Sequence, residues 1–124
     1  MKSLRVMIVD DSALTAKKIG VMLEEAGHIV ASVCESGDEA VRTYMDINPD
    51  VITMDITMLG MNGIEATKAI LEKNQNAIII MVTAHGQEQM VIDAIDAGAK
   101  GYLLKPIKPD SLIETIKKVY EKYS

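Results

Sequence analysis

Four short apolar segments of this 124-residue chain run into polar residues, which together could perform phosphoryl chemistry. In chain order they are Asp10, Asp11, Asp55, Thr83 and Lys105. A carboxylate can act as a nucleophile that accepts a phosphoryl group as an acyl phosphate. Carboxylate oxygens also suit a hard divalent cation, Mg²⁺ before Zn²⁺. Ammonium and hydroxyl groups can neutralise or hydrogen-bond phosphoryl oxygens.

Taken singly, each of these residues has an ordinary structural interpretation. Asp10 or Asp11 could cap a helix, Thr83 could end a strand by bonding its own backbone, and Lys105 could be a solvated loop lysine. Taken together, three carboxylates would repel one another, because two unit charges about 4 Å apart repel by about 4 kcal/mol at an effective dielectric near 20. Lys105 supplies one positive charge, so we expect Mg²⁺, for which Mn²⁺ can substitute. Asp55 is the best nucleophile candidate, with Asp10 and Asp11 as metal ligands.

The elements that must position these residues follow from a fivefold alternation of short, β-branched apolar runs with amphipathic stretches. The pattern predicts parallel strands, buried on both faces, at 5–9, 29–33, 51–54, 77–82 and 102–104. Five β–α units predict an α/β fold in one domain, residues 1–124, with an open doubly wound sheet. A TIM barrel would need about twice the length. In such sheets the functional crevice lies at the carboxyl ends of the strands, where the five polar residues would meet.

Helical spacing and end signals support this division. The apolar stripes expected to face the core are Ile19, Met22, Leu23 and Ala26; Ala40, Val41, Tyr44 and Met45; Met90, Val91, Ala94 and Ile95; and Leu112, Ile113, Ile116 and Val119. Residues 36–39 and 62–65 both read as capping boxes. Gly27 and Gly98 predict left-handed helix ends, and Pro109 suits a first helical turn.

Composition narrows the function classes. A net charge of −5, with four tyrosines as the complete aromatic set, argues against direct nucleic-acid binding and against an anionic membrane surface. The sequence contains neither an apolar run near the roughly 20 residues of a membrane span nor a secretory signal. The lone Cys34 excludes a disulfide framework and a Cys-rich zinc site. We therefore expect a cytoplasmic location, and we interpret most of the nine methionines as core residues.

An ordered set of short motifs runs through the whole chain. It comprises Val9-Asp10-Asp11-Ser12, Asp55, Met58 with Asn62-Gly63, Val82-Thr83-Ala84, Ala97-Gly98-Ala99, Gly101-Tyr102 and Lys105-Pro106. This set resembles the receiver domain of two-component response regulators. The resemblance implies a flavodoxin-like sheet with strand order 2-1-3-4-5 and a phosphoryl group passed from a sensor histidine kinase to Asp55. It also implies Mg²⁺ held by Asp10, Asp11, Asp55 and the backbone carbonyl of Thr57.

The same resemblance implies finer roles. It implies a cis Lys105–Pro106 peptide, a joint movement of Thr83 and Tyr102 on phosphorylation, and an influence of Thr57 and His85 on the rate of hydrolysis. For Tyr102, an ordinary half-buried strand aromatic remains an equal interpretation. The sequence departs from the family where Leu59-Gly60 replaces the usual proline after Met58, which predicts slower ordering of this loop around the metal.

The sequence ends at Tyr123 and Ser124 without an output domain, so we expect a chemotaxis-type, monomeric single-domain switch and not an enzyme. The resemblance to chemotaxis-type regulators implies that its surface of helix four, strand five and helix five would bind a downstream protein. Three alternatives remain. The chain could be a receiver from a longer DNA-binding regulator, or a receiver-like interaction module that is never phosphorylated. An aspartate-nucleophile phosphatase of the haloacid dehalogenase type is disfavoured, because Thr57 stands where that class needs a second aspartate.

Overall fold

The computed structural model describes residues 2–84 and 86–124, in which five strands alternate with five helices. The strands are β1 (Arg5–Val9), β2 (Ile29–Cys34), β3 (Val51–Asp55), β4 (Ile79–Thr83) and β5 (Gly101–Leu104). The helices are α1 (Ala13–Glu25), α2 (Gly37–Ile47), α3 (Gly63–Lys73), α4 (Glu88–Asp96) and α5 (Pro109–Tyr123).

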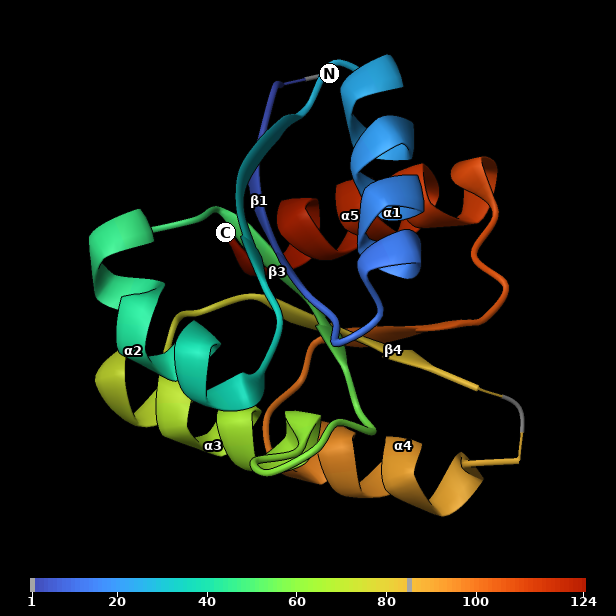
Figure 1. Cartoon of the computed structure of the whole chain (residues 1–124). Coiled ribbons are helices and arrows are strands. Elements are labelled where there is room, and N and C mark those ends of the chain that lie inside the picture. Colours follow the sequence, from blue (N-terminus) through green and yellow to red (C-terminus); the bar gives the residue numbers. More distant parts are fainter. Residues whose placement is uncertain (1, 85) are drawn as a thin grey trace.

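The strands form one parallel sheet with the order β2-β1-β3-β4-β5. The predicted doubly wound, flavodoxin-like fold and its strand order are therefore confirmed. Helices α1 and α5 lie on one face of the sheet, and α2, α3 and α4 lie on the other (Figure 1). The order of the strands reverses at β1 and β3, which are neighbours in the centre of the sheet. Ligand crevices in such folds lie at this switch point, beyond the carboxyl ends of the strands.

Two apolar clusters, one on each face of the sheet, form the core. Along β1, Met7 and Val9 pack in the cluster with α2, α3 and α4, whereas Val6 and Ile8 pack in the cluster with α1 and α5. Successive side chains of a strand point to opposite faces, so a strand covered on both faces must be apolar at consecutive positions. This explains why the central strands read as continuous apolar runs.

The two edge strands differ from the prediction of burial on both faces. Ile29 and Val33 of β2 are half-exposed, as are Tyr102 and Leu104 of β5. An edge strand has a neighbour on one side only, and the helices centre on the middle of the sheet. The predicted start of the fourth strand was also wrong. Ala77 donates its N–H to the carbonyl oxygen of Asn74 in the turn after α3, and β4 begins at Ile79.

Most residues of the predicted apolar stripes are at least partly buried, but three are exposed: Ala26, Met45 and Ile95. Ala26 is the C-cap of α1, and Met45 and Ile95 lie in the last turns of α2 and α4. Stripe residues near helix ends therefore face solvent where the helix extends past the core. Four methionines, Met7, Met54, Met58 and Met81, are buried. Three more, Met22, Met61 and Met90, are partly buried and pack against the core, so most of the methionines contribute to it as predicted.

The helix ends bear out most of the predicted signals. Asn62 and Glu65 form a complete capping box at the start of α3. The second predicted box is only half formed, because the Glu39 carboxylate accepts a hydrogen bond from the Glu35 N–H in place of the Ser36 N–H. Gly27 and Gly98 both have positive φ, and Pro109 occupies the first turn of α5.

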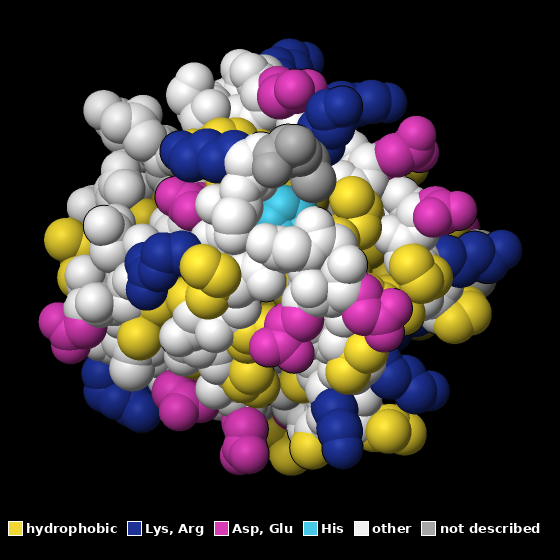
Figure 2. Space-filling model, turned by 90° about the horizontal axis from the view of Figure 1, so that it is seen from above, with side chains coloured by type: hydrophobic (Ala, Val, Ile, Leu, Met, Phe, Trp, Pro, Cys, Tyr) yellow, Lys and Arg dark blue, Asp and Glu magenta, His cyan; other side chains and the backbone are white. Residues whose placement is uncertain are grey.

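The surface seen in Figure 2 carries lysine and arginine side chains interspersed with aspartate and glutamate side chains. No continuous basic area covers this face of the molecule. Within residues 2–84 and 86–124, none of the helices is both long and apolar enough to span a bilayer.

A buried histidine generates the first testable prediction. His28 follows α1, and its Nδ1 accepts a hydrogen bond from the Leu4 N–H at 3.1 Å. Burial lowers the pKa of the His28 imidazole. The unfolded chain therefore binds the proton more readily, and the neutral imidazole contributes stability that is lost as the pH falls below about 6.5.

Replacing His28→Asn removes the titration and retains a side-chain acceptor for the Leu4 N–H. Between about pH 7.5 and pH 5, we expect the free energy of unfolding to fall more in the wild type than in His28→Asn. Urea titrations at several pH values measure this difference, in which the titrations of other groups cancel. Parallel pH dependences for the two proteins would contradict the prediction.

Candidate metal and phosphoryl site

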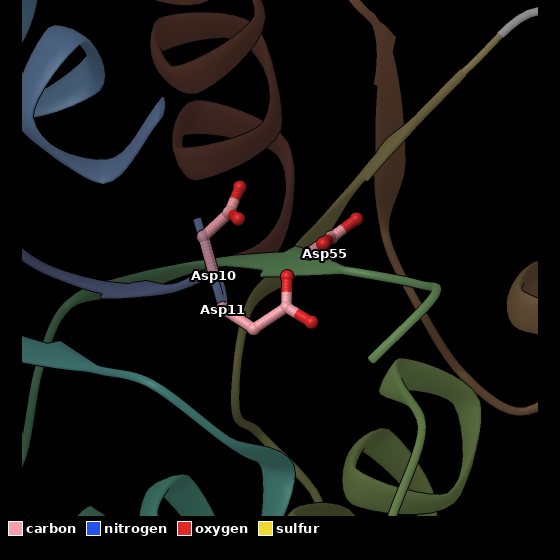
Figure 3. A group of neighbouring side chains, drawn as sticks. All are labelled: Asp10, Asp11 and Asp55. Atoms are coloured by element: carbon pink, nitrogen blue, oxygen red, sulfur yellow. The ribbon is translucent and has the colours of Figure 1, made fainter. Parts of the chain in front are cut away.

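Three carboxylates gather at the carboxyl ends of β1 and β3. Val9 lies beside Met54 in the sheet, so Asp10 and Asp55, which follow them, are neighbours. One oxygen from each of Asp10, Asp11 and Asp55 lies within 4.8 Å of the others. Figure 3 shows the first two residues at the end of β1 and Asp55 at the end of β3. The topology thus brings together residues that are 44 or more positions apart in the sequence.

Lys105 is the cation of this cluster. It follows β5, its peptide bond to Pro106 is cis, and its Nζ lies 3.5 Å from Asp10 Oδ2 and 3.5 Å from Asp55 Oδ1. Asp10 and Asp55 are buried, with relative exposures of 1% and 6%, whereas Asp11 is exposed. The cluster holds one ammonium and three carboxylates, so the site keeps an excess of negative charge when all of them are ionised.

The surroundings of Asp55 shift the pKa of its carboxyl group. Burial, followed by the neighbouring Asp10 carboxylate, raises the pKa of Asp55 from 3.8 to about 6, and Lys105 opposes the rise. The carboxyl group is therefore still mostly ionised at neutral pH, which is the form that can act as a nucleophile. It becomes protonated in mild acid, where an ordinary aspartate would remain charged.

The donor set suits a hard divalent cation. Asp10 Oδ1 accepts a hydrogen bond from the Ser12 N–H at 2.8 Å. Asp10 Oδ2 is buried without a hydrogen-bond donor in the described part of the chain, and the Lys105 ammonium lies 3.5 Å from it. An under-satisfied buried oxygen within an all-oxygen, negatively charged cluster is the environment that Mg²⁺ prefers. The residues present therefore fit this ion.

The simpler role of helix capping belongs to a different residue. Ser12 is the N-cap of α1, and its hydroxyl accepts a hydrogen bond from the Thr15 N–H at 3.3 Å. Asp10 supports the turn before this cap, and Asp11 projects beside the other carboxylates (Figure 3). The interpretation of either aspartate as the cap of α1 is therefore wrong.

The loop after Asp55 is held close to the start of α3. The Gly63 N–H donates to the Ile56 carbonyl at 2.8 Å, and a Cβ at position 63 would overlap the carbonyl oxygen of Asp55. Between Ile56 and Gly63, Leu59 is 89% exposed and Gly60 has a φ of +73°. Glycine adopts a positive φ without a steric penalty. The loop conformation therefore suits Gly60, which follows Leu59 at the position of the usual proline.

The remaining predicted residues lie around this cluster. Thr83 ends β4 and is buried, Thr57 is exposed on the loop after Asp55, and Tyr102 of β5 is 50% exposed. The half-exposed ring of Tyr102 fits both of its earlier interpretations. His85, expected to tune the rate of hydrolysis, lies outside the described residues.

One residue near the site was missed by sequence reasoning. Gln87 was not among the predicted site residues, but its side chain turns toward the site. Its Oε1 accepts a hydrogen bond from the Thr83 hydroxyl at 2.6 Å, and its Nε2 donates to Thr57 Oγ1 at 2.9 Å. The available signal was its position immediately before α4 and four residues after Thr83, from which a long amide can reach back to the strand end.

Comparison with known proteins finds sequence matches along most of the chain. The response regulator receiver domain family matches residues 6–117. The chemotaxis protein CheY of Thermotoga maritima is 46% identical over 115 residues, which cover 93% of this chain and 96% of that protein. CheY of Bacillus subtilis is 46% identical over 114 residues, or 92% of this chain and 95% of that protein.

A solved structure is also similar. The crystal structure of the CheX–CheY–BeF3–Mg complex from Borrelia burgdorferi matches with a TM-score of 0.88 and 36% identity. The match covers 94% of this chain and 88% of that chain. Its fold and its sequence therefore both resemble those of this protein.

The raised pKa of Asp55 predicts a pH-dependent gain in stability for Asp55→Asn. The metal-free folded protein binds the Asp55 proton more tightly than the unfolded chain, so protonation stabilises the fold, and this contribution is lost as the pH rises through about 6. Asparagine resembles the neutral carboxyl group at every pH. In chelator, Asp55→Asn should unfold at a higher temperature than the wild type at about pH 7.5, and the gap should narrow towards about pH 4.5.

The exposed Asp11 provides a control. Asp11→Asn removes a weaker repulsion between carboxylates and should therefore raise the unfolding temperature less than Asp55→Asn does. Calorimetric melting temperatures at both pH values measure the effect. A gap between Asp55→Asn and the wild type that widens in acid would show that the sign of the shift is wrong.

Two glycine variants test the close contact behind Asp55. Gly63→Ala should lower the free energy of unfolding by about 1–3 kcal/mol, because its Cβ meets backbone atoms that cannot move away. In Gly20→Ala, within α1, the nearest heavy atom to the added Cβ is a Val30 methyl group at 3.6 Å, an ordinary contact. Since alanine favours helices, this control should be neutral or stabilise by up to about 1 kcal/mol. Equal effects in denaturant titrations would argue against the close contact.

Proposed function

This chain belongs to the response regulator receiver family, and on that premise we propose that it is a single-domain, chemotaxis-type signalling switch. A sensor histidine kinase, or a small phosphodonor, transfers a phosphoryl group to Asp55. The observation that carries the proposal is the buried Asp10–Asp55 pair with Lys105 Nζ at 3.5 Å from both. The match to nearly the full length of two CheY proteins supports the chemotaxis-type role.

The chemistry starts from the ionised carboxylate of Asp55. One of its oxygens attacks the phosphorus of the donor while the bond from phosphorus to the donor nitrogen or oxygen breaks. The bonding electrons leave with the donor, and Asp55 becomes an acyl phosphate. Little covalent assistance is needed in such transfers, so the contribution of the protein is positioning and charge neutralisation. Lys105 lies where it can pair with a phosphoryl oxygen, and Thr83 can donate to another.

Four groups of this chain would hold the metal: the carboxylates of Asp10, Asp11 and Asp55 and the backbone carbonyl of Thr57. Bound there, Mg²⁺ or Mn²⁺ would neutralise charge that develops on the phosphoryl oxygens. Asp10 and Asp11 would otherwise repel the incoming dianion. In mild acid a proton competes for Asp55, so both metal binding and nucleophilic reactivity should weaken below about pH 6.

The output follows from the charge that phosphorylation adds. An aspartyl phosphate introduces about −1.5 to −2 charges, which would draw Lys105 and the Thr83 hydroxyl towards Asp55. Tyr102 is half-exposed beside α4, where it lines an apolar groove together with Val91, Ile92 and Leu104. We propose that Tyr102 moves with Thr83 and thereby changes the surface formed by α4, β5 and α5.

That surface would bind a downstream protein. The CheX–CheY complex is a receiver relative bound to another protein, which supports the proposal that this chain also binds a partner protein. We propose that this chain works as a monomer in the cytoplasm, without direct contacts to nucleic acid or membrane. It would not turn over an external substrate, although its own residues would assist its phosphorylation and dephosphorylation.

Incubation with acetyl phosphate and Mg²⁺, followed by intact mass spectrometry, tests the proposal. We expect one added phosphoryl group that hydroxylamine removes and that chelator prevents. Asp55→Asn should remain unmodified. Asp46→Asn, which changes an exposed carboxylate on α2, should be labelled like the wild type.

Other outcomes would select the alternatives. No mass increase in the wild type would favour a receiver-like interaction module that is never phosphorylated. Repeated hydrolysis of p-nitrophenyl phosphate by each molecule would favour a phosphatase. Labelling that persists in Asp55→Asn would place the acceptor on another residue.

A further inference from the structure

The side chain of Gln87 links the Thr83 hydroxyl to the loop that follows Asp55. Its Oε1 accepts two hydrogen bonds, from the Thr83 hydroxyl at 2.6 Å and from the Ala84 N–H at 3.0 Å. Its Nε2 donates to Thr57 Oγ1 at 2.9 Å and contacts Met90 Sδ at 3.7 Å. One planar amide therefore connects the end of β4, the loop after β3 and the first turns of α4.

A hydroxyl group has a single proton to donate. In this structure the Thr83 proton is directed to Gln87 Oε1, so it is not available to a phosphoryl oxygen on Asp55. The other contact of the Thr83 hydroxyl, at 3.4 Å from the Ala84 carbonyl oxygen, is much longer. For Thr83 to serve the phosphorylated site, the hydrogen bond to Gln87 must break.

Helix capping does not account for this arrangement. Gln87 occupies the N-cap position of α4, yet its side chain makes no capping hydrogen bond to that helix. Its amide is directed instead to Thr83, Ala84 and Thr57. The neighbouring Gln89 shows the contrasting case, because its exposed amide bonds Asp93 on the surface of the same helix.

We propose that Gln87 is a latch that holds Thr83 and Thr57 in the resting arrangement and thereby sets the threshold for activation. This inference rests on the proposed function, since the latch matters only if Asp55 is phosphorylated. Any contact present only in the resting state lowers the apparent affinity for ligands that require the active state. Gln87 is thus a positioning residue that acts through Thr83.

Removing the amide should therefore strengthen binding at the site. The probe is beryllofluoride with Mg²⁺, a non-covalent mimic of the phosphoryl group, titrated against ¹⁵N-labelled protein and followed by NMR. In Gln87→Leu, which roughly keeps the side-chain volume, we expect about fivefold tighter binding, the equivalent of about one net hydrogen bond. Gln89→Leu, the matched control on α4, should bind as the wild type does.

Two further measurements identify the route of the effect. In a Thr83→Ala background, Gln87→Leu should give no gain, because there is no hydroxyl left to release. In the wild type, the side-chain amide signals of Gln87 should shift when beryllofluoride binds, whereas those of Gln89 should not. Urea unfolding of each variant shows whether it is folded, and a general loss of structure would weaken binding, opposite to the expected direction.

The outcomes separate this inference from the proposed function. If the wild type does not bind beryllofluoride, the phosphorylation proposal fails. If the wild type binds it and Gln87→Leu binds equally or more weakly, the latch is wrong while the phosphorylation proposal stands. A gain that persists in the Thr83→Ala background would also overturn the latch, because the effect would then bypass Thr83.

Discussion

The shared contact of one ammonium with two buried carboxylates is the interaction on which the site depends. Lys105 Nζ lies 3.5 Å from both Asp10 and Asp55, and Asp11 adds a third carboxylate with an oxygen within 4.8 Å of the other two. One positive charge cannot balance three negative ones, and the pKa of Asp55 rises to about 6 as a result of burial and of this imbalance. A bound cation, a proton on Asp55 or a change in the position of the neighbouring groups would therefore reduce the electrostatic repulsion within the site.

The fold makes this arrangement possible by anchoring the acidic residues to its most buried elements. β1 and β3 are central strands, covered by helices on both faces, and their carboxyl ends meet at the switch point of the sheet. The rigidity of the core fixes the positions of the carboxylates although they repel one another. The loop after Asp55 is constrained at its far end by Gly63 and the capping box of α3, while Leu59 extends into solvent.

A receiver must also hold its resting state against activation. The side-chain amide of Gln87 joins Thr83, at the end of β4, to Thr57, on the loop after β3. Hydrogen bonds of this kind contribute little to overall stability, about 1 kcal/mol each. That size suits the proposed latch, because a stronger restraint would keep a phosphorylated form in the resting arrangement and a weaker one would not hold the resting form.

The sequence alone predicted the fold class, and the strand order through its resemblance to receivers. Periodicity and glycine signals depend on local physics, so the central strands and the left-handed ends at Gly27 and Gly98 could be predicted. Side-chain contacts between distant segments could not. The exposed faces of β2 and β5, the half-formed box at Ser36 and the exposure of Met45 depend on which neighbours the packed chain supplies.

The same division holds for the site. The residue types at the strand ends predicted a cluster of Asp10, Asp11 and Asp55 with Lys105, because parallel strands must bring their carboxyl ends to one edge. The sequence did not determine that Lys105 lies equally near both buried carboxylates, or that Gln87 turns from solvent towards Thr83. Only the tertiary structure decided these contacts, since long side chains select among several rotamers according to the partners within reach.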